Sequence, residues 1–165
     1  KVHEKFPNAR LIIGGTGELL ESCANLVTYL KLGEAVQLPG VIDRDFYINQ
    51  LDNAIAFVQH SVTAKNGDQE GTPLAVLEAS AAGLPVIASF HAGISDVILD
   101  NKTGLLFAEH DVDAMAEKMI WVIENKEQAK ALGQSGKERI KANFSMEKHL
   151  NVLNIIIDKV ISKNA

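Results

Sequence analysis

The chain has 165 residues, which is enough for one domain with its own hydrophobic core. It holds 16 basic and 21 acidic residues, and the net charge of −5 argues against a nucleic-acid-binding protein, because such proteins usually carry a basic face. No apolar run approaches the roughly 18 residues that a membrane span needs. The single cysteine, Cys23, excludes an internal disulfide, fits a reducing cytosol, and is expected to be a small buried apolar residue.

Short apolar runs alternate with longer helical patterns along the chain. In chain order, we expect a strand at 9–13, a helix at 18–32, a strand at 36–38, a helix at 44–51, a strand at 54–58, a helix at 73–82, a strand at 85–88, a helix at 94–99 and a strand at 105–107. From Val112 onward the pattern is helical, with Ser145 as the N-cap of the last helix and with Met115, Met119 and Trp121 as core residues.

The expected strands are continuously apolar rather than alternating, which is typical of a parallel sheet covered on both faces. The sequence therefore predicts an α/β fold, a Rossmann-like parallel sheet with helices on both faces and a helical C-terminal tail. Residues 1–6 have the pattern of the tail of a helix, which Pro7 and Asn8 end just before a strand. A natural domain rarely opens in this way, so we expect the chain to be a piece of a longer protein, truncated on its N-terminal side.

In parallel α/β sheets, ligands bind at the carboxyl ends of the strands. The loops to consider are therefore 14–17, 40–43, 59–72 and 89–93. The first contains Gly15-Thr16-Gly17, but a dinucleotide-binding fingerprint would need a third glycine where this chain has Leu20. This departure argues against an NAD-dependent oxidoreductase, and a glycine turn at the end of a strand is a sufficient explanation.

The segment from Glu70 to Glu78 carries the clearest chemical signal. Thr72 is expected to cap a helix that Pro73 opens, so the amides of the first turn would lack helical partners. Those amides and the positive end of the helix dipole form a site suited to a diphosphate. Eight helical residues span about 12 Å, so the two carboxylates could flank a diphosphate and accept hydrogen bonds from a ribose diol and a sugar diol.

This segment is similar to the E-x7-E signature of family 4 glycosyltransferases, which have the GT-B architecture of two Rossmann-like domains. Four further segments resemble bacterial exopolysaccharide-type members, in the family's order: Ser61–Gly71, Glu78–Ala88, Gly93–Ile98 and Thr103–Phe107. The resemblance covers almost the whole chain. It implies that the chain is the nucleotide-sugar-binding half of a retaining glycosyltransferase that acts in polysaccharide or glycoconjugate synthesis.

The resemblance also implies a role for each residue of the site. Glu70 contacts the donor sugar, and Glu78 holds the ribose. The phosphates lie on Gly71, Thr72, Pro73 and Leu74, and the base lies beside Val41, Ile42 and Asp43. Such enzymes need no bound metal or separate cofactor, because helix amides and cations stabilise the leaving diphosphate. The sequence has no cluster with metal-ligand spacing, and no residue is assigned as a catalytic nucleophile or base.

The chain departs from the family pattern at its start. The arginine and lysine that contact the phosphates in the family would precede Lys1, and the acceptor-binding domain is expected to be a missing N-terminal part of the same protein. We therefore expect the isolated chain to bind a nucleoside diphosphate sugar and to transfer no sugar. Lys65 and Arg44 are the nearest replacement cations but are more simply interpreted as solvated charges, and His60 as a loop residue.

Two other functions stay open, a GT-B nucleotide-sugar epimerase and a non-catalytic nucleotide-binding module. An upstream acceptor domain of similar size would favour the transferase over the module. The expected partners are the nucleoside diphosphate sugar and the missing acceptor domain, with neither nucleic acid nor a membrane span. The expected location is the cytoplasm, with contact to the inner face of the membrane only through the missing domain.

Overall fold

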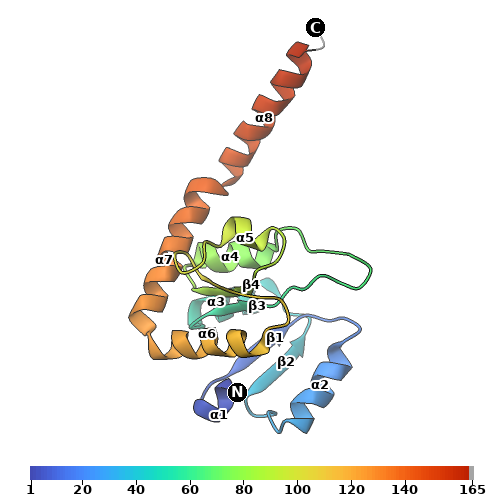
Figure 1. The fold of residues 1–165 in the computed structure, drawn as a ribbon, viewed down its shortest axis with the longest axis vertical. Helices are drawn as coiled ribbons and strands as arrows, with labels where there is room; N and C mark the ends of the chain where they lie inside the picture. The colour runs from blue at the N-terminus through green and yellow to red at the C-terminus, as the bar shows by residue number, and fades with distance from the viewer. Residues whose placement is uncertain (164–165) are drawn as a thin grey trace. The chain divides into compact units, whose positions relative to one another are not determined.

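The structure is a computed structural model, and it describes residues 1–163. The chain divides into two compact units, Lys1–Asn53 and Ala54–Ala165, each of which is described by itself. Both units are built from parallel strands and helices that alternate along the chain (Figure 1). The predicted α/β class with parallel strands is confirmed. The strands pair in two separate sheets, however, and not in the single sheet that the sequence suggested.

The first unit holds a two-stranded parallel sheet. Its elements are α1 (Val2–Lys5), β1 (Leu11–Gly14), α2 (Leu20–Tyr29), β2 (Val36–Gly40) and α3 (Arg44–Asn53). Leu11 pairs with Val36 and Gly14 pairs with Gly40. Strand β2 thus continues through Pro39, which the sequence analysis had placed after the strand. The fixed φ of proline suits an extended chain, and a strand with one neighbour can spare the missing N–H.

Little of the first unit is buried, since Ala35 is its only buried hydrophobic residue. Cys23 is exposed, so the prediction of a buried cysteine was wrong. Leu19 and Leu26, which share helical spacing with Cys23, are exposed too, by 72% and 55%. The helical period was therefore correct, but no layer covers that face within the described residues.

The second unit holds a three-stranded parallel sheet in the order β3-β4-β5. Its strands are β3 (Phe57–Gln59), β4 (Val86–Ser89) and β5 (Leu105–Phe107), and its helices up to residue 143 are α4 (Leu74–Ala82), α5 (Ile94–Val97), α6 (Val112–Glu124) and α7 (Lys126–Asn143). Helices α4 and α6 lie on opposite faces of this sheet (Figure 1). The central strand β4 is buried along its whole length, as its continuously apolar sequence predicts.

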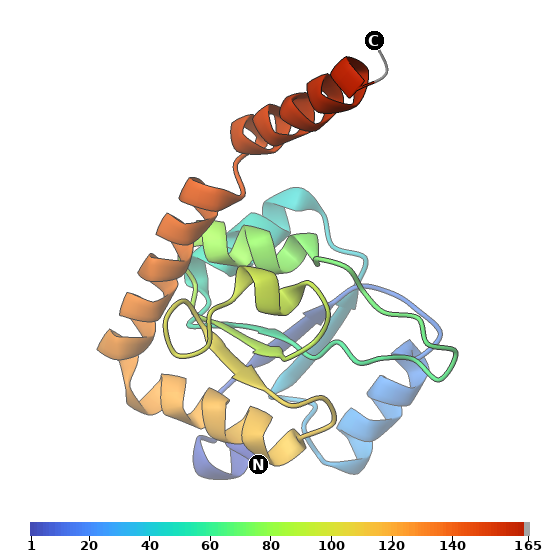
Figure 2. The same ribbon diagram turned by 45° about the horizontal axis from the view of Figure 1, so that its top comes forward.

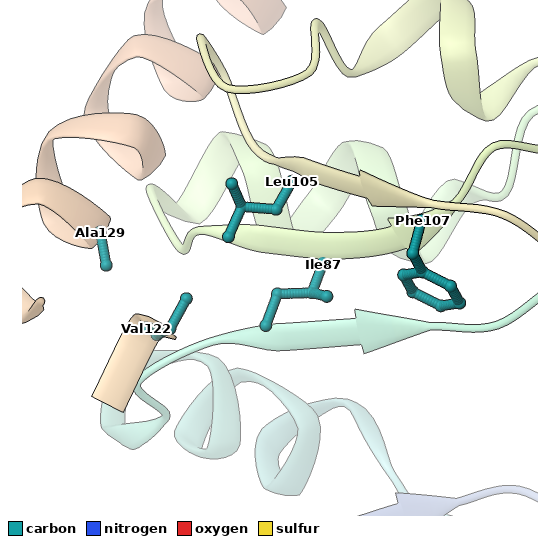
Figure 3. Close-up of a cluster of buried hydrophobic side chains, with 5 residues drawn as sticks. All are labelled: Ile87, Leu105, Phe107, Val122 and Ala129. Carbon is teal, nitrogen blue, oxygen red and sulfur yellow. The ribbon is translucent and has the colours of Figure 1, made fainter. Parts of the chain in front are cut away.

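One buried hydrophobic cluster of the second unit lies between the sheet and helices α6 and α7. Ile87, Leu105, Phe107, Val122 and Ala129 form a buried cluster (Figure 3). The partly buried side chains of Met115, Met119 and Trp121 pack against it, which confirms their predicted place in the core. Burying one large aliphatic side chain is worth about 1.5–3 kcal/mol, so this cluster anchors the sheet whose strand ends carry the loops of interest.

Helix α8 (Met146–Lys163) follows α7 as a separate helix at the C-terminal end of the second unit (Figure 2). The Lys148 N–H donates to Oγ of Ser145 over 3.3 Å, which confirms Ser145 as the cap of the last helix. Among the described residues, no helix is both long enough and apolar enough to cross a membrane.

Candidate functional site

The N-terminus of α4 is the centre of the candidate site. The helix begins at Leu74, and Pro73 is its N-cap, with φ −61° and ψ 124°. The expectation that Thr72 caps the helix was therefore wrong. The carbonyl oxygen of Pro73 accepts from the N–H groups of Val76 and Leu77, so the extended proline itself starts the first turn. Pro73 is buried and has no N–H, and it can shape a phosphate site but cannot donate to one.

Residues Gly71 and Thr72 are held by the turn that follows β4. The Gly93 N–H donates to the Gly71 carbonyl over 3.0 Å. A Cβ at Gly93 would lie 2.5 Å from Oγ1 of Thr72 and 2.7 Å from the Gly71 oxygen, so only glycine permits this approach. Within residues 1–163, the amides of Gly71, Thr72 and Leu74 donate no hydrogen bond. Three free donors at the positive end of a helix suit an anionic ligand.

Glu70 stands just before this helix and is held at two points. Its Oε2 atom accepts from the Ser61 hydroxyl over 2.6 Å and from Nε2 of Gln59 over 3.4 Å. Its backbone N–H donates to Nε2 of His91 over 3.3 Å. The carboxylate is exposed, so it keeps lone pairs for a ligand hydroxyl.

Glu78 lies in the second turn of α4 and is exposed. Its carboxylate accepts no hydrogen bond from the part of the chain that the structure describes. The two glutamates therefore belong to the same unit, Glu70 before the first residue of α4 and Glu78 within the helix. The Glu70 carboxylate is held by Ser61, whereas the Glu78 carboxylate has no such hydrogen bond among the described residues. The idea that they face one shared cleft stays a prediction.

His91 and Glu109 form a pair that the sequence analysis missed. His91 is buried, with 2% of the residue exposed, and its Nδ1 atom lies 2.6 Å from Oε1 of Glu109. The other Glu109 oxygen accepts from the Thr63 N–H over 2.8 Å. That hydrogen bond, followed by the one with His91, lowers the pKa of the Glu109 carboxyl below its ordinary value of 4.5. A lone histidine in a loop gave no signal, because its partners come from distant parts of the chain.

The residues expected beside the base, Val41, Ile42 and Asp43, lie in the first unit, directly after β2. Val41 is 80% exposed, whereas Ile42 packs over Gly14, where an added Cβ would lie 2.7 Å from its Cδ1 atom. The Asp43 carboxylate accepts from the Phe46 N–H over 2.8 Å and so caps α3. Ile42 and Asp43 thus have structural roles in this unit, and contact with a base stays a prediction for all three.

The other charged candidates are ordinary surface residues. Arg44, His60 and Lys65 are all exposed, as expected. Two hollows of about 490 and 340 Å³ open on the second unit, the larger one beside Phe90, Leu106 and Glu109 and the smaller one beside Trp121. Among the described residues, no group of three His, Cys, Asp or Glu side chains gathers as a metal site would require.

Parallel strands that alternate with helices, with helices on both faces of the sheet, are the architecture of the GT-B class. Comparison with known families agrees with this. Residues 1–139 match the family described as glycosyl transferases group 1, and the chain belongs to that family.

One relative and two solved structures illustrate the similarity. The putative colanic acid biosynthesis glycosyltransferase WcaL of Escherichia coli (strain K12) is 34% identical over 110 residues, which are 67% of this chain and 27% of that protein. The crystal structure of S. aureus TarM with fondaparinux, alpha-GlcNAc-glycerol and UDP is 29% identical, with a TM-score of 0.78 over 93% of this chain and 30% of that one. Sucrose-phosphate synthase from Thermosynechococcus elongatus has a TM-score of 0.82 at 24% identity, over 98% of this chain and 41% of that one.

Proposed function

We propose that this chain is the donor-binding domain of a retaining glycosyltransferase, which moves a sugar from a nucleoside diphosphate sugar to an acceptor hydroxyl. The observation that carries the proposal is the start of α4, where three free amides adjoin a Glu70 carboxylate held by Ser61. Free amides at a helix start favour a diphosphate, and a restrained exposed carboxylate favours a sugar diol.

Each part of the donor has a proposed partner. The diphosphate lies on the amides of Gly71, Thr72 and Leu74, with Pro73 shaping the turn. The ribose diol donates to Glu78, and the transferred sugar donates to Glu70. The base lies beside the segment from Val41 to Asp43. As the sugar leaves, charge grows on the diphosphate, and preorganised amides stabilise it without a metal ion.

The relatives support the donor class and the setting. WcaL is named for colanic acid biosynthesis, and the TarM structure contains UDP. The chain spans 27% of the length of WcaL and 30% of that of TarM. We therefore propose that an acceptor-binding domain of the same protein completes the active site, and that this domain provides any contact with the inner face of the membrane. The proposed location is the cytoplasm.

The proposal is tested by calorimetric titration of the 165-residue chain with UDP, UDP-glucose, GDP and GDP-mannose. We expect weak binding of at least one nucleotide with its sugar, and an affinity that falls with salt because the diphosphate is charged. Glu117→Ala, which removes an exposed helix glutamate on α6, is the control for Glu78→Ala. An absence of binding for the whole panel would contradict the proposal.

Turnover separates the transferase from the two alternatives. The isolated chain is expected to transfer no sugar, because positioning of the acceptor supplies much of the rate enhancement. In the intact parent protein, a sugar-bearing acceptor as product indicates a transferase, whereas an epimerised sugar indicates an epimerase. Nucleotide binding without either product would leave a binding module.

A further inference from the structure

We infer that the His91–Glu109 pair positions Glu70 for the donor sugar, an inference that rests on the proposed function of Glu70. His91 follows β4 and Glu109 follows β5, so the pair stands on the carboxyl ends of two adjacent strands. Neither residue is assigned a direct contact with the donor. Both act through the loop between β3 and α4, which carries Glu70 and projects from this end of the unit (Figure 2).

The hydrogen bonds define the state of the His91 ring. The Glu70 N–H donates to Nε2, so Nε2 must carry a lone pair. The remaining proton is then on Nδ1, which donates to Oε1 of Glu109 over 2.6 Å. His91 is thus neutral, with its tautomer fixed by the carboxylate on one side and by the amide on the other. A ring protonated at both nitrogens would set two donors against each other at Glu70.

The pair joins both ends of the loop. Glu109 accepts from the Thr63 N–H at the start of the loop, and His91 accepts from Glu70 at its end. Ser89 adds a third tie, since its hydroxyl donates to the Ser61 carbonyl over 2.6 Å. Ser61 in turn holds the Glu70 carboxylate. The backbone and the side chain of Glu70 are therefore fixed from two directions before a ligand arrives, which is the arrangement that preorganised sites use.

The next residues along the chain are held independently. Gly71 is tied to Gly93 through its carbonyl, and Thr72 lies against the same glycine. Loss of the His91 contact should therefore release Glu70 while the amides proposed for the diphosphate keep their places. This difference gives the inference a specific signature, a loss of affinity for the sugar nucleotide without a matching loss for the free nucleotide.

Two substitutions separate the two ring nitrogens. His91→Asn keeps an amide donor near the position of Nδ1 and loses the acceptor for the Glu70 N–H. His91→Gln keeps an acceptor near the position of Nε2 and loses the donor to Glu109. We expect His91→Asn to weaken the sugar nucleotide by roughly threefold to tenfold and to spare the nucleotide, and His91→Gln to retain more of the sugar affinity. His110→Asn is the matched control, because His110 is exposed and its φ of 64° suits asparagine.

The titrations use UDP with UDP-glucose and GDP with GDP-mannose. A second measurement needs neither ligand nor variant: ¹⁵N NMR of the imidazole in the wild-type chain. A neutral ring protonated on Nδ1, with slow exchange of the Glu70 amide, supports the inference. A ring protonated on Nε2, or equal losses for nucleotide and sugar nucleotide in His91→Asn, would overturn it. A wild-type chain that binds no probe but shows the expected tautomer and amide protection would overturn the proposed function and leave the positioning of Glu70 standing.

Discussion

The Ser61 hydroxyl donates a 2.6 Å hydrogen bond to the Glu70 carboxylate across nine residues of sequence. The same serine is tied to the sheet, because its carbonyl accepts from the Ser89 hydroxyl at the end of β4. Ser61 therefore links the exposed Glu70 carboxylate to the end of the buried central strand β4 through two hydrogen bonds. This relationship makes Ser61 the simplest place to ask whether the orientation of Glu70 matters for binding.

Ser61→Ala should weaken the sugar nucleotide more than the free nucleotide. The change removes one hydrogen bond to Glu70 and leaves the backbone carbonyl that holds Ser89. A single hydrogen bond contributes about 0.5–1.5 kcal/mol, which corresponds to roughly twofold to tenfold in affinity. Calorimetry with both ligands measures this. Ser135→Ala, on the exposed side of α7, is the control and should change neither affinity.

Gly133→Ala should destabilise the second unit. A Cβ at this position would collide with the Gly83 carbonyl oxygen and lie 2.8 Å from backbone atoms of Leu84 and Pro85, so α7 would have to move away from the turn after α4. Overpacking of this kind costs about 1–3 kcal/mol, to be measured by urea unfolding. Gly33→Ala, where an added Cβ meets nothing within 4 Å, should have a much smaller effect. Equal stabilities of the two variants would contradict the close packing.

Glu109→Gln should destabilise the chain at neutral pH, by an amount that shrinks in acid. The pKa of Glu109 is lowered in the folded state, by hydrogen bonds from Thr63 and then His91. A lowered carboxyl pKa contributes stability that is full above the ordinary value of 4.5 and is lost as pH falls through the folded-state pKa. Urea unfolding of both proteins from neutral to acid pH measures the difference. Glu127→Gln, on the exposed start of α7, is the control variant. It should not show the loss of stability at neutral pH that shrinks in acid.

The sequence predicted the elements well because their signals are local. The end of α4 illustrates this, since Gly83 has φ 92° and ends the helix where the glycine suggested. The start of α4 was misplaced by one residue, because Pro73 keeps an extended ψ of 124° and is the N-cap itself, so the helix begins at Leu74. Cys23 was misjudged because helical period predicts an apolar face but not what covers it.

The site was predictable only in part. Glu70, the start of α4 and Glu78 lie in one continuous segment, so the sequence spacing was enough to predict that they are close together. His91 and Glu109 lie 18 residues apart and reach Glu70 through the order of the strands, which no local pattern encodes. The split of the strands into two sheets has the same origin, since pairing between strands is a tertiary property.

The last prediction separates the two glutamates. Glu78 is assigned to the ribose, which every nucleoside diphosphate carries, and Glu70 to the sugar, which only the full donor carries. Loss of a hydrogen bond to a charged group costs about 1.5–3 kcal/mol, roughly tenfold or more in affinity. Glu78→Ala should therefore weaken UDP and UDP-glucose, or GDP and GDP-mannose, by about the same factor.

Glu70→Ala should spare the free nucleotide and weaken only the sugar nucleotide, and in the intact parent protein it should also lower turnover. This variant removes the carboxylate and keeps the backbone in place, because the N–H of residue 70 still donates to His91 and the Gly71 carbonyl still accepts from Gly93. Calorimetry with both ligands at one fixed salt concentration, with Glu117→Ala as the control, is the measurement. Equal losses for both ligands in Glu70→Ala would mean that Glu70 does not recognise the sugar, and the assignment of the two ends of the donor would have to be abandoned.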